Sequence, residues 1–181
     1  MAEVWREWGG VIVASLVALP VVALTVAVLA GVRRRRGMPP RVAWWRSAAE
    51  VGMVAGTLPW VWMILTPKDA PRRVHLTPFR DIAVQLTDPS TLVVQIGGNL
   101  LVFAALGFFA PIRWPVLAGA GRVFAFGAAA SILVELAQYV LDLGRVSSVD
   151  DVLVNAVGAT VACILSRRWW REAADRMICV C

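Results

Sequence analysis

Charged residues are scarce in this sequence: 17% of its 181 residues are charged, whereas 59% are hydrophobic. Soluble domains usually contain about 25% charged residues, so this balance excludes an ordinary soluble globular chain and implies that apolar surface faces lipid. The sequence also lacks basic stretches interleaved with stacking aromatics and the common nucleic-acid-binding motifs. We therefore expect membrane lipid, and no nucleic acid, as a partner of this chain.

Cysteine and histidine are rare as well, with three cysteines and one histidine. Cys163 lies within an apolar run, and Cys179 and Cys181 lack the Cys-x-x-Cys spacing typical of metal and redox sites. This pattern argues against a disulfide framework, and the sequence has no histidine cluster for a metal. We expect neither a metal nor a cofactor.

Long hydrophobic runs, in contrast, are abundant. Crossing a hydrocarbon core of about 30 Å takes roughly 20 apolar residues in a helix. The runs predict an all-α, polytopic membrane bundle of about five transmembrane helices, at residues 9–32, 47–65, 92–112, 123–141 and 152–165. The last run is short, but it becomes adequate if its helix starts near Ser148, which has capping-box spacing with Asp151. We divide the chain into an N-terminal helix with a basic loop (1–46), a transmembrane domain (47–171) and a tail (172–181).

Basic residues predict the orientation of the chain. Segments on one side of the predicted helices carry twelve of them: Arg33 to Arg36, Arg41, Arg46, Arg113, Arg122, Arg167, Arg168, Arg171 and Arg176. The other side carries six: Arg6, Lys68, Arg72, Arg73, Arg80 and Arg145. Cytoplasmic segments are richer in Lys and Arg, so we expect a multi-pass cell-membrane protein with its N-terminus outside and its C-terminus in the cytoplasm. On the cytoplasmic side, Glu50 is expected to pair with Arg46 four residues earlier, and we assign it no function.

The longest connection, residues 66–91, should then lie outside. It contains the motif His75-Leu-Thr-Pro-Phe-Arg-Asp81, followed by an apolar stretch at 82–86 that is too short to span a membrane. We expect a short interfacial or re-entrant element at this stretch.

Polar side chains inside the last three runs cluster near their predicted outer ends. Spacings of three or four residues put Gln95 with Asn99, and Glu135 with Gln138, on shared helix faces. The rise of a helix puts this cluster roughly 6 to 12 Å below the outer surface. Ionisable residues in a membrane are costly and by default mark a functional site or a buried pair. We predict an outward-facing ligand pocket lined by Glu135, Gln138, Arg145, Asp151, Asn155 and Asn99.

Two interpretations stay open for Asn99, Asn155 and Gly158, because amide and small residues also pack membrane helices together. Glu135 favours a functional interpretation, since an intramembrane carboxylate must be paired, protonated or hydrated. Arg145 is a candidate partner for Glu135, although an Arg145 to Asp151 pair could simply hold the loop.

At these residues the sequence resembles the VanZ-like family of bacterial membrane proteins, whose namesake is associated with resistance to the glycopeptide teicoplanin. The resemblance covers most of the chain after the first helix and rests on Glu135-Leu-Ala-Gln138, Arg145-Val-Ser-Ser-Val-Asp150-Asp151 and Asn155-Ala-Val-Gly158. Two further stretches agree with the family, Thr77-Pro-Phe-Arg80 and Asn99-Leu-Leu-Val-Phe103 with Leu106-Gly-Phe108. The sequence departs from it at Ser148, Ala105 and His75, where many members have Asp, Pro and Asn. The change at Ser148 weakens a two-carboxylate interpretation of the loop.

The resemblance implies a role in the cell envelope without assigning a reaction. One hypothesis is a non-enzymatic protein that binds a lipid-linked cell-wall precursor or related amphiphile and alters its exposure to teicoplanin. Arg80 and Arg145 would then meet an anionic head group. The amides of Asn99, Gln138 and Asn155 would hydrogen-bond it, and Glu135 would tune the charge of the site.

Two other function classes are alternatives. A membrane-embedded enzyme would use Glu135 as general acid or base, assisted by Asp151 or His75, but the sequence offers no nucleophile set and no metal cluster. A small transporter would use Glu135 to carry protons. The inner halves of the last three runs contain almost no polar residues, which argues against a continuous transport path.

Overall fold

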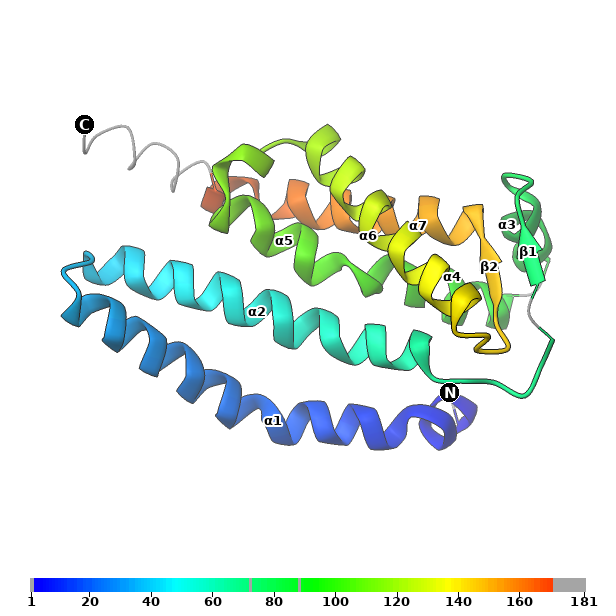
Figure 1. The fold of residues 1–181 in the computed structure, drawn as a ribbon, viewed down its shortest axis with the longest axis horizontal. Helices are drawn as coiled ribbons and strands as arrows, with labels where there is room; N and C mark the ends of the chain where they lie inside the picture. The colour runs from blue at the N-terminus through cyan, green and yellow to red at the C-terminus, as the bar shows by residue number, and fades with distance from the viewer. Residues whose placement is uncertain (1, 72, 88, 171–181) are drawn as a thin grey trace.

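The computed structural model describes residues 2–71, 73–87 and 89–170, and most of them are helical (Figure 1). Within these residues, the main helices are α1 (Ala2–Arg35), α2 (Pro40–Leu65), α4 (Pro89–Val102), α5 (Ala104–Arg113), α6 (Ala120–Val140) and α7 (Val149–Leu165). Short elements join them: strand β1 (Arg73–His75), helix α3 (Arg80–Gln85), the 3-10 helix η1 (Pro115–Leu117) and strand β2 (Val146–Ser148). The predicted all-α bundle is confirmed. The predicted tail, 172–181, lies outside the described residues.

Four helical segments in the described part of the chain are long and apolar enough to cross a membrane: Trp8–Arg35, Pro40–Leu65, Val94–Arg113 and Ala120–Val140. Helix α7, the fifth predicted span, has 17 residues and is shorter than these four. Apolar side chains of α1 are largely exposed, with Val17 at 70% and Leu24 at 64%. A helix of this length with so much exposed apolar surface requires lipid around it, so the chain is a membrane protein.

One predicted helix is divided in two. The sequence predicts a continuous helix over 92–112, but α4 ends at Val102 and α5 begins at Ala104. Phe103 between them has φ −110° and ψ 15°, outside the helical region. Its side chain is buried in the hydrophobic core, so tertiary packing overrides the local helical tendency at this position. A backbone hydrogen bond from Gly107 N to Phe103 O (2.8 Å) begins the second helix.

Glycines bring α7 into close contact with α4 and α5. A Cβ atom added at Gly158 would lie 2.1 Å from the carbonyl oxygen of Leu100, and one added at Gly107 would lie 2.0 Å from that of Ala159. Both glycines therefore meet a neighbouring backbone that leaves no room for a side chain. For Gly158 this geometry favours the helix-packing interpretation.

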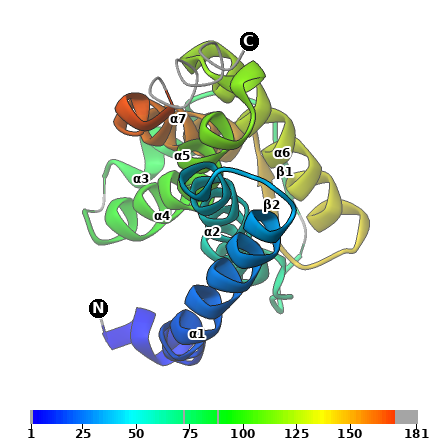
Figure 2. The same cartoon turned by 90° about the vertical axis from the view of Figure 1, so that its left-hand side faces the viewer.

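The bundle has two ends of different character (Figure 1). The α1–α2 connection, the α5–α6 connection and the end of α7 lie at one end, which we call the basic end (residues 33–41, 113–122 and 165–168). The elements β1, α3 and β2 lie at the other, which we call the loop end (residues 66–87 and 141–151). Helix α1 lies at the edge of the bundle and packs mainly against α2 (Figure 2).

Glu50 pairs with arginines from two other helices, not with Arg46 as predicted. Its carboxylate accepts hydrogen bonds from Arg33 of α1 and Arg113 of α5, and Arg33 also donates to Ser47 Oγ (2.8 Å). Salt bridges between partly buried groups are screened less than an exposed i,i+4 pair on one helix. Three helices are thereby joined through one carboxylate at the basic end.

Candidate functional site at the loop end

A short parallel pairing between two distant segments organises the loop end. Strand β1 pairs with β2 in the register Arg73 with Val146, Val74 with Ser147 and His75 with Ser148. A backbone hydrogen bond from Lys68 N to Leu143 O (2.8 Å) extends the contact. The connection after α2 is thereby fixed against the connection before α7. Hydropathy does not predict this pairing, because strands of three residues carry almost no pattern.

Asp150 holds the start of α3 in place. The residue is 2% exposed, and its carboxylate accepts hydrogen bonds from the backbone N–H groups of Phe79, Asp81 (2.8 Å) and Ile82 (3.1 Å). Phe79 has a φ of 64°, in the left-handed region, and the three N–H groups surround the first turn of this short helix. The sequence alone does not predict this role of Asp150. General principles are consistent with this contact, because a buried carboxylate needs hydrogen-bond donors and the N–H groups in the first turn of a helix have no partners within that helix.

Asp81 connects β1 to the start of α7. One oxygen of its carboxylate lies 2.8 Å from His75 Nδ1, and the other accepts a hydrogen bond from Ser148 Oγ (2.6 Å). The Ser148 hydroxyl also caps α7 by accepting from Asp150 N (3.2 Å). The predicted N-cap at Ser148 is thus confirmed, but the reciprocal capping box with Asp151 is not formed. The backbone N–H of Ser148 instead donates to Glu135 Oε2 (3.2 Å).

Glu135 and Asp151 lie beneath this network and face each other across α6 and α7. Asp151 accepts a hydrogen bond from the Asn99 side chain of α4. The Glu135 carboxyl group lies close enough to Asp151 and to Arg145 to interact electrostatically with both. Asp151 lies close enough to Asp81 for an interaction of the same kind. The structure therefore brings these side chains together, and we call Asn99, Glu135, Arg145 and Asp151 the loop-end cluster; its contact with a ligand stays a prediction.

Arg145 lies over the end of α2. Its guanidinium donates from Nε to Thr66 O (2.9 Å) and from Nη2 to Met63 O (2.7 Å), which are carbonyls of the last turn of that helix. Cations at the C-terminus of a helix interact favourably with its dipole. Arg145 thus links the α6–α7 connection to α2, and its predicted contact with a ligand stays a prediction.

Gln138 and Asn155 lie deeper and bind neighbouring helices. Gln138 donates from Nε2 to Ile64 O (2.7 Å), and Asn155 donates from Nδ2 to Ser131 Oγ (2.8 Å). The side-chain oxygens of both amides are buried and have no hydrogen-bond partner. Their donor groups hold helices together, whereas their buried acceptor groups have no partner among the described residues.

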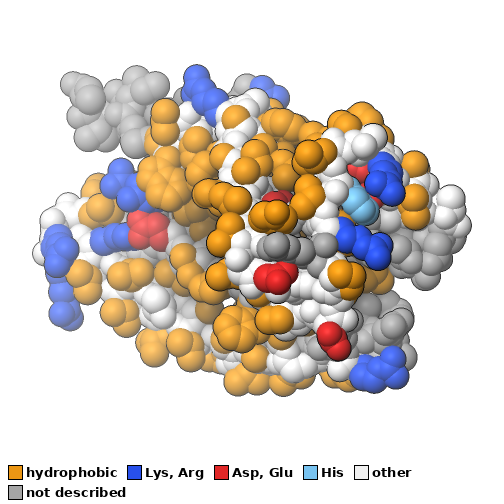
Figure 3. All heavy atoms as spheres, turned by 45° about the vertical axis from the view of Figure 1, so that its right-hand side comes forward, with side chains coloured by type: hydrophobic (Ala, Val, Ile, Leu, Met, Phe, Trp, Pro, Cys, Tyr) orange, Lys and Arg blue, Asp and Glu red, His pale blue; other side chains and the backbone are white. Residues whose placement is uncertain are grey.

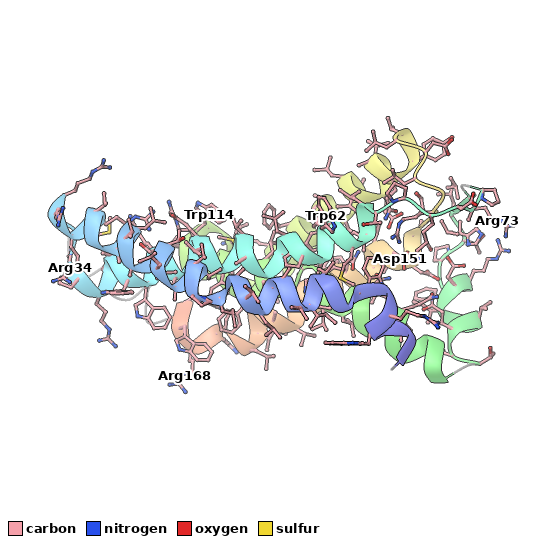
Figure 4. All side chains as sticks on the ribbon, turned by 90° about the horizontal axis from the view of Figure 1, so that it is seen from below. Arg34, Trp62, Arg73, Trp114, Asp151 and Arg168 are labelled. Atoms are coloured by element: carbon pink, nitrogen blue, oxygen red, sulfur yellow. The ribbon has the colours of Figure 1, made fainter. Side chains whose placement is uncertain are left out.

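The last predicted ligand residue, Arg80, is exposed at the first position of α3. Apolar side chains on the same segment are also exposed: Leu76 at 73%, Phe79 at 66% and Val84 at 66%. In Figure 3, blue basic and orange apolar side chains surround the pale blue His75 at this end of the molecule. Figure 4 shows Arg73 extending from the loop end, with Asp151 farther inside the bundle. The short interfacial element predicted at 82–86 corresponds to α3, which begins two residues earlier.

The pattern of the motif residues can now be compared with known proteins. A family model described as VanZ/LLP1 matches residues 53–171. The chain belongs to the VanZ-like family. The match contains every residue of the loop-end cluster and leaves α1 outside. No curated protein and no solved structure matches the chain.

Two departures from the VanZ-like pattern lie at the same place. His75 and Ser148 are register partners in the β1–β2 pairing, and both contact the carboxylate of Asp81. They therefore form one connected hydrogen-bonded group. Within the described residues, no group of three His, Cys, Asp or Glu side chains is arranged to hold a metal ion.

Proposed function

We propose that this VanZ-like protein binds a lipid-linked cell-wall precursor, or an amphiphile of the same kind, at its loop end, which faces outside the cell. One observation carries the proposal: the β1–α3 segment presents exposed arginines beside exposed apolar side chains, while buried carboxylates hold it in place. Such an amphiphile joins an anionic phosphate to a long apolar chain. It therefore needs both kinds of contact at one surface of the membrane.

The exposed arginines suit the phosphate part of the ligand. Arg73 lies on β1 and Arg80 at the start of α3, and both are exposed. A guanidinium can donate two parallel hydrogen bonds to one phosphate, which fixes its orientation as well as its charge. Arg145 lies behind them, on the carbonyls at the end of α2. Its proposed role is to meet the head group from the bundle side.

The apolar side chains suit the membrane surface. Leu76 and Phe79 are 73% and 66% exposed, although each lies in a segment fixed by hydrogen bonds. Exposed apolar side chains next to basic ones are typical of elements that enter the boundary between head groups and acyl chains. A ligand whose chain stays in the outer leaflet would reach Arg80 without leaving the membrane.

The carboxylates and amides have a different proposed role. Asp81 and Asp150 bind groups of the loop itself and so keep Arg80 in position. Glu135 sets the charge beneath the head group, and sugar hydroxyl groups of the precursor would donate hydrogen bonds to the acceptor oxygens of Gln138 and Asn155. Sequestering a cell-wall precursor in this way would change its exposure to teicoplanin, as the family resemblance implies.

The test is direct binding to the full chain in nanodiscs of neutral lipid. The probe is a fluorescent polyprenyl pyrophosphate, with the uncharged polyprenol of the same length for comparison. We expect saturable binding of the pyrophosphate only, and about tenfold weaker binding by Arg80→Ala, since one charge-assisted contact is lost. Asp69→Asn, which alters an exposed carboxylate at the same end, is the matched control and should bind as wild type does.

Three results would count against the proposal: no saturable binding, equal binding of the polyprenol, or unchanged affinity in Arg80→Ala. Mass spectrometry of the bound lipid separates the alternatives. Recovery of the intact probe supports a binding protein, whereas a shortened or dephosphorylated product would support the enzyme alternative and direct attention to Glu135.

A further inference from the structure

The basic end contains an open cavity of about 660 Å³ where α1 turns into α2. It is lined by Arg34 and Arg35 of α1 and by Met38, Pro39 and Pro40 of the turn. Its volume is in the range typical of small-molecule sites. The cavity lies outside the segment that matches the VanZ-like family and at the opposite end of the bundle from the cluster described above (Figure 4).

The four consecutive arginines at the end of α1 divide into two groups. Arg33 is directed into the bundle, where it binds Ser47 Oγ (2.8 Å) and Glu50. Arg34, Arg35 and Arg36 are exposed, and the first two line the cavity. Only the first of these arginines thus has a structural role in joining α1 to α2.

The cavity has no acidic residue from its own hairpin. Glu50 is the only Asp or Glu in the sequence between residues 8 and 68, and its carboxylate is already shared by Arg33 and Arg113. Arg41, at the start of α2, adds another exposed positive charge. A bound anion would neutralise the positive charges that Arg34 and Arg35 bring to the cavity.

At this hairpin the partial negative charge at the C-terminus of α1 lies near the partial positive charge at the N-terminus of α2, so the arginines supply most of the positive potential. Gly37 has a φ of 87°, and the N–H groups of Gly37 and Met38 bind the carbonyls of Arg34 and Arg33 (3.0 Å each), so the C-terminus of α1 is satisfied within the turn. The N-terminus of α2 has no side-chain cap, because Pro39 occupies the cap position. An uncapped N-terminus of a 26-residue helix carries partial positive charge next to the arginines of the cavity.

We propose that this cavity binds the phosphate group of an anionic ligand, held by Arg34 and Arg35. An anionic phospholipid of the adjoining leaflet supplies that group most directly, and a soluble phosphate shares the same chemistry. Val28 and Val32, which precede Arg34 on α1, are 54% and 39% exposed and can contact acyl chains. Trp44 and Trp45 on α2 are also exposed, as aromatic residues at the level of lipid head groups commonly are.

The test uses the full chain released from nanodiscs that contain equal amounts of phosphatidylglycerol and phosphatidylcholine, with retained lipids counted by native mass spectrometry. Wild type should retain phosphatidylglycerol preferentially. Arg34→Gln/Arg35→Gln should reduce that preference about tenfold or more, as expected for two arginines near an anionic head group. Arg34→Lys/Arg35→Lys, which keeps both charges, should restore most of it and exclude misfolding as the cause.

The matched control is Arg167→Gln/Arg168→Gln, which alters two adjacent exposed arginines at the same end that do not line the cavity. It should retain phosphatidylglycerol as wild type does. A second arm adds inorganic phosphate. If inorganic phosphate displaces the lipid, the cavity binds a phosphate group from either source. If it does not, the cavity binds the phospholipid specifically. Equal loss in the control pair, or unchanged retention in Arg34→Gln/Arg35→Gln, would overturn the proposal.

Discussion

Polar side chains at the loop end bind backbone groups of distant segments, so each of them positions a segment. Asp150 binds three N–H groups at the start of α3, and Arg145 binds two carbonyls at the end of α2. Removing one partner of a buried hydrogen bond leaves the other partner unsatisfied, which lowers the free energy of unfolding by about 1–3 kcal/mol. A substitution of Asp150 or Arg145 should therefore free a segment of backbone in addition to breaking individual hydrogen bonds.

Asp150→Asn should loosen the start of α3. The substitution removes a negative charge that three N–H groups share, and an amide nitrogen would face donors instead of accepting from them. We expect amide hydrogen exchange of Phe79, Asp81 and Ile82 to accelerate by roughly tenfold or more while exchange in α6 is unchanged. Asp69→Asn should leave exchange as it is. Protection that persists in Asp150→Asn would show that other contacts hold α3.

Gly158→Ala should destabilise the bundle by about 1–3 kcal/mol, because the new Cβ would overlap the carbonyl of Leu100. Helices α4 and α7 would have to separate to admit it. Gly97→Ala is the matched control, since a Cβ at Gly97 meets nothing within 4 Å. The measurement is the thermal unfolding midpoint of each purified variant in detergent. If both variants melt as wild type does, the close approach of α4 and α7 contributes little to stability.

At the scale of whole elements, the helices could be predicted and their connections could not. Hydropathy alone locates both ends of α6 and α7 to within three residues, because lipid imposes length and polarity on each helix. It places the starts of α1 and α2 seven residues too late, because these helices extend beyond their apolar runs. The contacts that fix α3 cannot be read in this way. They join Asp150 to residues 68 to 71 positions earlier, and no local pattern specifies such a pairing.

For the same reason, only part of the candidate site can be predicted from the sequence. Helical spacing puts Gln95 with Asn99, and Glu135 with Gln138, on shared faces, because residues three or four apart on a helix are neighbours. It does not foresee that Ser148 N binds Glu135, or that His75 and Ser148 share Asp81. It also pairs Glu50 with Arg46, because the spacing of residues within one helix carries no information about partners on other helices.

The three-helix ion network at the basic end gives a prediction at this scale. Arg33→Gln and Glu50→Gln should show a coupling energy of about 1 kcal/mol or more in a double-mutant cycle, because both groups are partly buried and hydrogen-bonded. The cycle of Arg46→Gln with Glu50→Gln should show almost none. Chemical unfolding in detergent supplies the free energies. If Glu50 couples more strongly to Arg46 than to Arg33, the pairing predicted from helical spacing is the correct one.

For the whole molecule, the arginines at the basic end predict orientation. A fluorescent protein fused at the C-terminus should fluoresce, because it would remain in the cytoplasm, where the positive-inside rule puts this end. Alkaline phosphatase inserted after Asp69 should be active, since that enzyme functions only outside. The reversed pattern would place the loop end in the cytoplasm, and the proposed ligand of the outer leaflet would then have no access to Arg80.

Growth in the presence of teicoplanin tests whether the loop-end cluster has the proposed role in the cell. A susceptible host that expresses wild type should tolerate more teicoplanin than a host with empty vector, with vancomycin for comparison. Glu135→Gln, Arg145→Ala and Asp151→Asn should abolish the gain, because the first and third remove the charges beneath the proposed head-group site and the second releases the connection over α2. Asp69→Asn should retain it.

Membrane levels of each variant decide what a loss means. Loss of tolerance at equal abundance indicates that the cluster acts on a ligand. Loss together with low abundance indicates that these residues mainly hold the helices together, as Asn155 and Ser131 do. If wild type gives no tolerance but binds the polyprenyl pyrophosphate, the lipid site stands and resistance is not its role in this chain. Binding and tolerance thus test separate claims, since a bound precursor affects an antibiotic only where that antibiotic competes for it.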